Sequence, residues 1–255
     1  LIHCDLFSDI LGLCMTIIVI LPQHTKQQIG PEGKAKDFKQ PVLFLLHGMS
    51  DDHSIWLRRT SIERYVSQLG LAVVMPAAHK SRYSNLSTGE RYWDYISQEV
   101  PALARSFFNL SDKREDSFVA GLSMGGFGAM KLGLNCPDQF AAAASLSGAL
   151  TCNWNVDNKK LQGMERAFGN EESYRGSIND LRHIAGELDK SDKLKPKLYQ
   201  ACGSEDFLIK NNHDFKDFID PLGFDFTYEE EPGTHEWGYW DKKIKRVLEW
   251  LPLKR

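Results

Sequence analysis

The chain carries Gly121-Leu122-Ser123-Met124-Gly125-Gly126, in which glycines stand on both sides of one serine. The apolar segment 117–120 before it is typical of a short strand, and the small and apolar residues 127–132 after it suit a buried helix. Where a strand turns sharply into a helix, the neighbouring residues need to lack side chains, because the two elements pass closely. The stretch therefore predicts strand, sharp turn and helix, with the Ser123 hydroxyl exposed at the edge of a sheet.

This predicted turn has the form of the nucleophile elbow of the α/β-hydrolase fold. Patterns of this kind also arise by chance, and the alternative is a glycine-rich helix–strand contact with a surface serine. The strand before the serine and the helix after it favour the elbow. An elbow requires an acid and then a histidine later in the chain, and an oxyanion-hole loop before the serine.

Strand-like and helix-like segments alternate along the rest of the chain. Strands are expected at 13–21, 41–46, 71–75, 140–146, 197–202 and 224–230, and helices at 60–69, 93–108, 178–188, 208–222 and 240–251. Residues 60–63 have the pattern of a capping box, and Pro101 should bend the helix that contains it. The alternation predicts an α/β fold with a mostly parallel central sheet and helices on both faces.

The segment 151–195 interrupts this alternation. It is polar, carries Trp154 and Phe168, and has helical spacing only around 178–188. We expect it to be a small cap inserted over the site. Nothing else divides the 255 residues, and this class of domain often reaches that length, so 1–255 is predicted to be one α/β-hydrolase domain.

The composition limits the partners and the compartment. A net charge of −3 without a basic stripe argues against nucleic acid. Five scattered cysteines without a Cys-x-x-Cys pair argue against a disulfide framework or a zinc site, and favour a reducing, cytoplasmic location. The apolar run 11–21 is too short to span a bilayer and follows no basic residues, so we expect a buried strand and no membrane partner. The chain begins at Leu1 rather than Met, so a targeting signal could lie upstream.

A serine hydroxyl needs an adjacent base to become a nucleophile, and the base needs an orienting acid. The histidines after the serine are His183, His213 and His235. His183 lies in the expected cap and His213 inside an expected helix, whereas His235 lies in the loop between the last strand and the last helix. An α/β-hydrolase delivers its base from that loop, so His235 is the predicted base.

The acid is expected in the turn after the strand 197–202. Asp206 is our choice, because it ends that turn and precedes the histidine in the chain. Glu205 is the near competitor, and Asp225 would point from within a strand. An N-cap on the following helix would by itself also explain an aspartate at position 206.

Acyl transfer also needs N–H donors for the developing oxyanion. One is expected at Met124, directly after the serine, and the other at Met49, in the loop after the strand 41–46. Its neighbour Gly48 lets the backbone turn its amides inward. We expect His47 to hold this loop by hydrogen bonds rather than to act in catalysis.

Two tryptophans, Trp56 and Trp154, are candidates for the wall of an acyl pocket, although a lone tryptophan is more often part of the core. Metal and cofactor sites are not predicted. His235-Glu236 begins like a zinc-protease motif, but Tyr239 stands where the second histidine would fall. The aromatic residues of the loops suit substrate contact and subunit contact equally well, which leaves a homo-oligomer open.

Four blocks in this order resemble the tributyrin-esterase branch of the putative esterase family. That family is similar to esterase D, also called S-formylglutathione hydrolase, and it includes feruloyl and acetylxylan esterases and mycolyltransferases. The blocks are Leu45-Leu46-His47-Gly48-Met49-Ser50, Gly121-Leu122-Ser123-Met124-Gly125-Gly126, Cys202-Gly203-Ser204-Glu205-Asp206-Phe207 and Gly233-Thr234-His235-Glu236-Trp237.

The resemblance implies Ser123 as nucleophile, His235 as base and Asp206 as acid, with oxyanion donors at Met124 and Met49. It implies a cofactor-free serine carboxylesterase whose partner is a small ester with a short acyl chain, of the tributyrin or acetyl-ester type. The alternative is a thioesterase like S-formylglutathione hydrolase, or an acyltransferase, with the same three residues.

The resemblance has departures. Asp51-Asp52 stands where the family's turn is richer in glycine or asparagine. His47-Gly48-Met49 replaces the Ser-Gly-Leu of esterase D, which argues against a glutathione thioester as substrate.

Overall fold

One sheet runs through the protein, in a computed structural model that describes residues 1–27, 33–35, 38–154 and 158–254. Its strand order is β1-β2-β4-β3-β5-β6-β7-β8, with β2 antiparallel to both of its neighbours and the remaining pairs parallel. The strands are β1 (Ile2–Ser8), β2 (Leu13–Ile20), β3 (Val42–Leu46), β4 (Ala72–Pro76), β5 (Ser117–Leu122), β6 (Ala142–Leu146), β7 (Lys197–Gly203) and β8 (Phe226–Glu231). The predicted mostly parallel sheet is confirmed.

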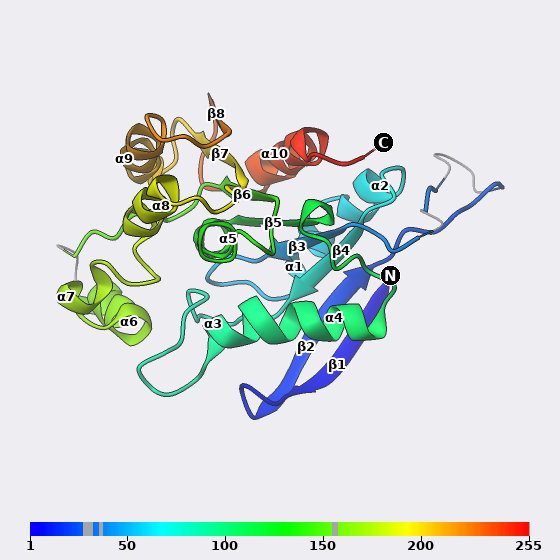
Figure 1. The fold of residues 1–255 in the computed structure, drawn as a ribbon, viewed down its shortest axis with the longest axis horizontal. Helices are drawn as coiled ribbons and strands as arrows, with labels where there is room; N and C mark the ends of the chain where they lie inside the picture. The colour runs from blue at the N-terminus through cyan, green and yellow to red at the C-terminus, as the bar shows by residue number, and fades with distance from the viewer. Residues whose placement is uncertain (28–32, 36–37, 155–157, 255) are drawn as a thin grey trace.

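Helices cover both faces of the sheet, as predicted. They are α1 (Ile55–Arg59), α2 (Ile62–Val66), α3 (Tyr92–Asp94), α4 (Val100–Phe107), α5 (Met124–Asn135), α6 (Asn158–Phe168), α7 (Glu171–Tyr174), α8 (Leu181–Lys190), α9 (Ile209–Ile219) and α10 (Trp237–Trp250). Figure 1 shows α2 and α10 together on one side of the sheet and α4 on the other.

The central strands explain this layering. Every residue of β3 is buried, and successive side chains enter different hydrophobic clusters. Val42, Phe44 and Leu46 pack with α4 and α5, whereas Leu43 and Leu45 pack with α2 and α10. A strand covered on both faces has no polar face, which is why it reads as a continuous apolar run.

The helices expected at 60–69 and 93–108 differ from the prediction in detail. The expected helix 60–69 is only α2, and a separate α1 precedes it. Thr60 joins them, because its hydroxyl donates to the Trp56 carbonyl and accepts from the Ile62 N–H, so no capping box with Glu63 forms. Pro101 lies in the first turn of α4, directly after a π-helical turn over Tyr95–Glu99, and the bend expected from it stays a prediction.

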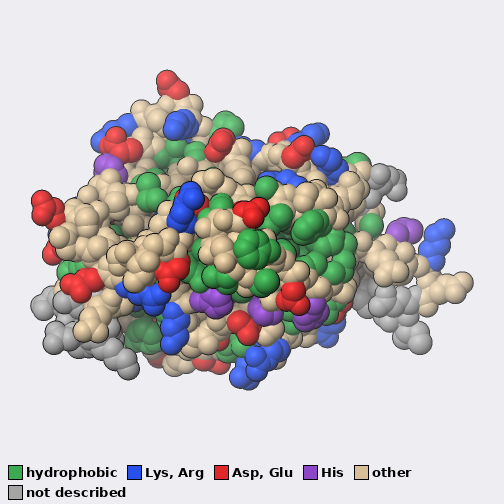
Figure 2. Space-filling view, turned by 90° about the horizontal axis from the view of Figure 1, so that it is seen from below, with side chains coloured by type: hydrophobic (Ala, Val, Ile, Leu, Met, Phe, Trp, Pro, Cys, Tyr) green, Lys and Arg blue, Asp and Glu red, His purple; other side chains and the backbone are tan. Residues whose placement is uncertain are grey.

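The strand β1 was not predicted. Its half-buried Ile2, Cys4 and Leu6 alternate with exposed residues, and it pairs with β2 as a hairpin at the edge of the sheet. Figure 2 looks onto the face that carries this hairpin and α4, and hydrophobic side chains gather over its centre. Phe7 on β1 and Phe107 on α4 are exposed large hydrophobic residues.

The segment 151–195 contains α6, α7 and α8, of which α8 corresponds to the helix expected at 178–188. Residues 155–157 of this segment lie outside the described residues, as do residues 28–32 and 36–37 between β2 and β3. The α8 side chains Leu181 and Ala185 are buried in the same hydrophobic cluster as the α5 side chain Phe127. A capping role for the segment stays a prediction. Within the described ranges, no helix has both the length and the apolar composition that crossing a bilayer requires.

Candidate active site

The serine of the predicted elbow stands between β5 and α5 with φ 52° and ψ −116°, a left-handed conformation that non-glycine residues rarely adopt. Two glycines make the turn possible. A Cβ on Gly121 would lie 2.3 Å from the Gly125 carbonyl oxygen, and a Cβ on Gly125 would lie 2.4 Å from the Leu46 carbonyl oxygen. The helix therefore begins against the backbone of the strands, and Ser123 occupies the apex.

The structure brings Ser123, His235 and Asp206 together from three separate loops. His235 Nε2 lies 3.0 Å from Ser123 Oγ, and His235 Nδ1 lies 2.8 Å from Asp206 Oδ2. Asp206 is 2% exposed. Burial opposes its ionisation, but hydrogen bonds from His235 and from the Leu208 N–H outweigh burial and hold the pKa of Asp206 below its usual value. A buried carboxylate is thus kept charged beside the imidazole.

The alternative acids and bases have other partners. Glu205 accepts from the Gly233 N–H and so supports the loop that carries His235. His213 Nε2 lies 2.7 Å from a carboxylate oxygen of Glu230, and Asp225 lies 3.3 Å from the Lys197 ammonium. His183 lies on α8 and lines a different cavity.

Two aromatic rings flank the imidazole of His235. The Phe207 ring centroid lies 4.5 Å from that of His235, and the Trp240 centroid lies 4.8 Å away, edge to face. Trp240 is buried, whereas Phe207 is 76% exposed. Sequence reasoning missed Phe207, although an apolar residue directly after the acid in an exposed turn was a usable signal.

The loop after β3 is held by the ring of His47. The His47 Nδ1–H donates to the Gly48 carbonyl at 2.7 Å, and His47 Nε2 accepts from the Ala78 N–H at 2.9 Å. This pair of bonds requires the neutral ring, and burial lowers the pKa of His47 to about 4. The predicted structural role of His47 is confirmed.

The same bond fixes the direction of the Met49 N–H. In a planar trans peptide the C=O and N–H point in opposite directions. Since the Gly48 carbonyl points at the His47 ring, the Met49 N–H points away from it. A Cβ on Gly48 would lie 2.8 Å from the Leu122 side chain and 3.8 Å from Ser123 Cβ, so this loop lies against the elbow. Met124 is the first residue of α5, and an N–H there has no carbonyl within the helix to donate to.

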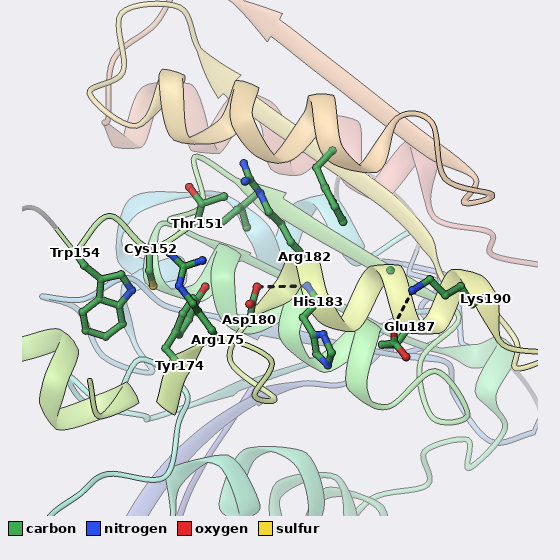
Figure 3. A pocket seen from close by; sticks show the side chains of 13 residues that line it. Thr151, Cys152, Trp154, Tyr174, Arg175, Asp180, Arg182, His183, Glu187 and Lys190 are labelled. Atoms are coloured by element: carbon green, nitrogen blue, oxygen red, sulfur yellow. Dashed lines mark hydrogen bonds and ion pairs between the residues drawn. The ribbon is translucent and has the colours of Figure 1, made fainter. Parts of the chain in front are cut away.

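The two tryptophans differ. Trp56 is 0% exposed and its indole N–H donates to the Leu46 carbonyl, so it belongs to the core and offers no surface to a substrate. That expectation was wrong. Trp154 packs edge-on against Tyr174 and lines a cavity of about 430 Å³ between α7, α8 and the segment 150–154 (Figure 3). Its contact with an acyl group stays a prediction.

A strained serine at a strand–helix turn, backed by a histidine and a buried carboxylate, is the arrangement of serine hydrolases with the α/β-hydrolase fold. The chain belongs to the putative esterase family, whose sequence model matches residues 8–251.

Relatives over the full length agree with this. An acetyl esterase from Caldicellulosiruptor saccharolyticus is 30% identical, over 98% of this chain and 97% of that protein. Two Staphylococcus aureus structures are each 36% identical, over 98% of this chain and 97% of theirs. They are the fluorophosphonate-binding serine hydrolase FphF, with a TM-score of 0.84, and the S-formylglutathione hydrolase FrmB, with a TM-score of 0.82. The predictions of the family and of a serine carboxylic ester hydrolase are confirmed.

Proposed function

We propose that the protein hydrolyses small esters with short acyl chains through an acyl-enzyme on Ser123. The observation that carries the proposal is the 3.0 Å approach of His235 Nε2 to Ser123 Oγ, with Asp206 on the other ring nitrogen. The similarity to an acetyl esterase and the resemblance to tributyrin esterases support the short acyl chain.

In the first half-reaction, Ser123 Oγ attacks the ester carbonyl while its proton passes to His235 Nε2. The resulting imidazolium is stabilised by Asp206, which stays ionised and holds the Nδ1–H. His235 then gives the proton to the leaving alcohol oxygen. In the second half-reaction, His235 takes a proton from water while the water oxygen attacks the acyl carbonyl, and His235 then returns the proton to Ser123 Oγ as the acid is released.

The negative charge on the carbonyl oxygen needs donors that are in place before the reaction. We assign this role to the Met124 N–H and the Met49 N–H, with Gly48 allowing the close approach of the loop. Support comes from the helix position of Met124 and from the orientation of the Gly48 carbonyl toward His47.

A second candidate is a thioesterase or acyltransferase that uses the same three residues. The similarity to S-formylglutathione hydrolase FrmB favours a thioester. A thiolate is a better leaving group than an alkoxide, so the same acyl-enzyme chemistry would serve it. The departure at His47-Gly48-Met49 from the esterase D pattern argues for the ester.

We also propose a reducing, cytoplasmic location and self-association. The five cysteines are all free in the structure, which supports a reducing compartment. Exposed Phe7 on β1 and Phe107 on α4 support contact with a second copy.

Hydrolysis of a p-nitrophenyl ester series from acetate to long acyl chains tests the proposal. The wild-type rate should be greatest at short chains. Ser123→Ala should lower kcat by at least about 10⁴-fold with the fold intact, because the nucleophile is gone. Ser106→Ala, an exposed serine on α4, is the matched control and should keep full activity. Retained activity in Ser123→Ala would mean another nucleophile. Faster turnover of S-acyl thioesters than of the matching esters would favour the second candidate.

A further inference from the structure

Lys131 lies on α5, two turns beyond the elbow, and its side chain is completely buried. Its ammonium donates to the Tyr83 carbonyl at 3.0 Å, to Ser84 Oγ at 3.0 Å and to Asn179 Oδ1 at 2.6 Å. The three acceptors are neutral, and the nitrogen also lies 4.4 Å from the centroid of the Trp93 ring. All three ammonium protons are therefore donated to neutral acceptors.

Such a group is costly to bury. Burial lowers the pKa of Lys131 well below its usual value. A buried cation loses its hydration, and without an opposite charge beside it no ion pair compensates for that loss. A methionine would fill similar space without that cost. The lysine is thus not explained by core packing, and its partners indicate what it does.

Two of its acceptors belong to a segment whose backbone is strained. Arg82 and Tyr83 both have left-handed backbone conformations, with φ 52° and 51°. Such conformations persist only where the surrounding structure fixes them. The Tyr83 ring packs directly on α5, since a Cβ on Gly128 would lie 2.5 Å from it. Lys131 therefore holds a strained turn against the helix that begins at the nucleophile.

That turn in turn holds the loop after β3. The Tyr83 hydroxyl donates to the His47 carbonyl at 3.0 Å, and the Ala78 N–H, from the same connection, donates to His47 Nε2 at 2.9 Å. His47 then orients the Gly48 carbonyl and with it the Met49 N–H. A chain of direct contacts runs from Lys131 through Tyr83 and His47 to the second oxyanion donor.

We propose that Lys131 is a positioning residue for the oxyanion hole, which it sets through Tyr83 and the loop 47–49. The inference rests on the proposed function, because it assumes that the Met49 N–H stabilises the oxyanion. Lys131 touches no reacting atom. It fixes a donor whose contribution is made in the transition state rather than in substrate binding, so its loss should appear in kcat and not in KM.

Tyr83→Phe tests the link to the loop, since it removes one hydroxyl and leaves the ring in place. With p-nitrophenyl butyrate, kcat should fall on the order of tenfold while KM stays within about twofold. Tyr95→Phe is the matched control. Tyr95 is also fully buried, and in the described part of the chain its hydroxyl has no hydrogen-bond partner, so its removal should leave both constants unchanged.

Lys131→Met tests the ammonium itself. It should lower kcat at least as much as Tyr83→Phe does. Butylboronic acid forms a tetrahedral adduct that places an oxygen in the oxyanion site. It should bind Lys131→Met and Tyr83→Phe on the order of tenfold more weakly than the wild type. If Lys131→Met does not fold, Ser84→Ala removes one of the ammonium's acceptors on the turn and takes its place. An unchanged kcat in the variant that folds would overturn the proposal, as would a rise in KM alone.

The activity of Ser123→Ala shows whether a negative result concerns the proposed function or only the positioning role of Lys131. Activity in Ser123→Ala would remove the proposed function and the positioning role with it. An inactive Ser123→Ala combined with wild-type turnover in Tyr83→Phe and Lys131→Met would remove the positioning role alone.

Discussion

Two loops meet at Ser123, and their shapes are encoded in different ways. The elbow is determined by residues within four positions of the serine, because Gly121 and Gly125 allow backbone to lie on backbone. In the loop 47–49, the His47 ring and the Asp51 N–H donate locally to the Gly48 carbonyl, but His47 itself is held by Ala78 and Tyr83, 31 and 36 residues away. The nucleophile is therefore specified by a short motif, whereas the position of the predicted oxyanion donor also depends on distant contacts.

The largest effect is expected from a substitution in the elbow, whose shape is encoded locally. Gly125→Ala would place a Cβ 2.4 Å from the Leu46 carbonyl oxygen, which cannot move without disturbing β3. The free energy of unfolding should fall by about 3 kcal/mol or more, as in severe overpacking. Urea denaturation of the wild type and the variant measures this loss.

Its control is Gly186→Ala in the interior of α8, where the nearest atom to an added Cβ lies 3.8 Å away. Alanine should stabilise that helix by up to about 1 kcal/mol. Equal effects at positions 125 and 186 would contradict the account of the elbow as a backbone contact.

The next effect concerns the loop 47–49, where the contribution of His47 to the stability of the protein depends on pH. The pKa of His47 is lowered by burial from 6.5 to about 4, so the unfolded chain binds more protons than the folded one between these values. The stability contributed by the neutral ring is therefore complete above pH 6.5 and is lost as the pH falls toward 4, by about 3 kcal/mol in total. Unfolding free energies measured across this range should show the slope.

His47→Gln should lack this contribution. The gap in stability between the wild type and His47→Gln should narrow as the pH falls from 6.5 to 4, because only the wild type loses the benefit of a neutral imidazole. A gap that stays constant with pH would show that His47 does not titrate in this window.

The smallest effect is expected at Phe207, which belongs neither to the elbow nor to the loop 47–49. Phe207→Ala removes the exposed ring beside His235. For an ester with an aromatic leaving group, KM should rise about fivefold, equivalent to about 1 kcal/mol of lost contact. For an ethyl ester of the same acid, KM should change by less than about twofold. Equal losses for both esters would instead indicate that the ring acts on His235 rather than on the alcohol.

The two modes of encoding also decide what could be predicted from the sequence. Continuous apolar runs identified β3 and β4, and the glycines identified the elbow. The positions of Asp206 and His235 followed from the order of elements in the chain, and the structure brings both to Ser123. The edge strand β1 was missed because its alternation is half polar and lies outside any buried run.

The role of His47 in the loop 47–49 was predicted, but the support that this loop receives from distant residues could not be. Tyr83 and Lys131 lie 36 and 48 residues from the groups they hold, and Tyr83 stands in a polar connection without periodicity. Trp56 was a candidate for a pocket wall, with the core as the alternative, because a tryptophan suits both places. Only its complete burial separates the two.

The close contact at Gly121 and Gly125 has a consequence for redesign of the protein. Since the start of α5 lies directly on strand backbone at Gly121 and Gly125, the position of the nucleophile is set by residues that a designer would not change to alter the substrate. Exposed side chains around it, among them Phe207, which packs on His235 and not on the elbow, can be exchanged as a library while Ser123 keeps its position. The scaffold thus separates where the reaction occurs from which molecule is admitted to it.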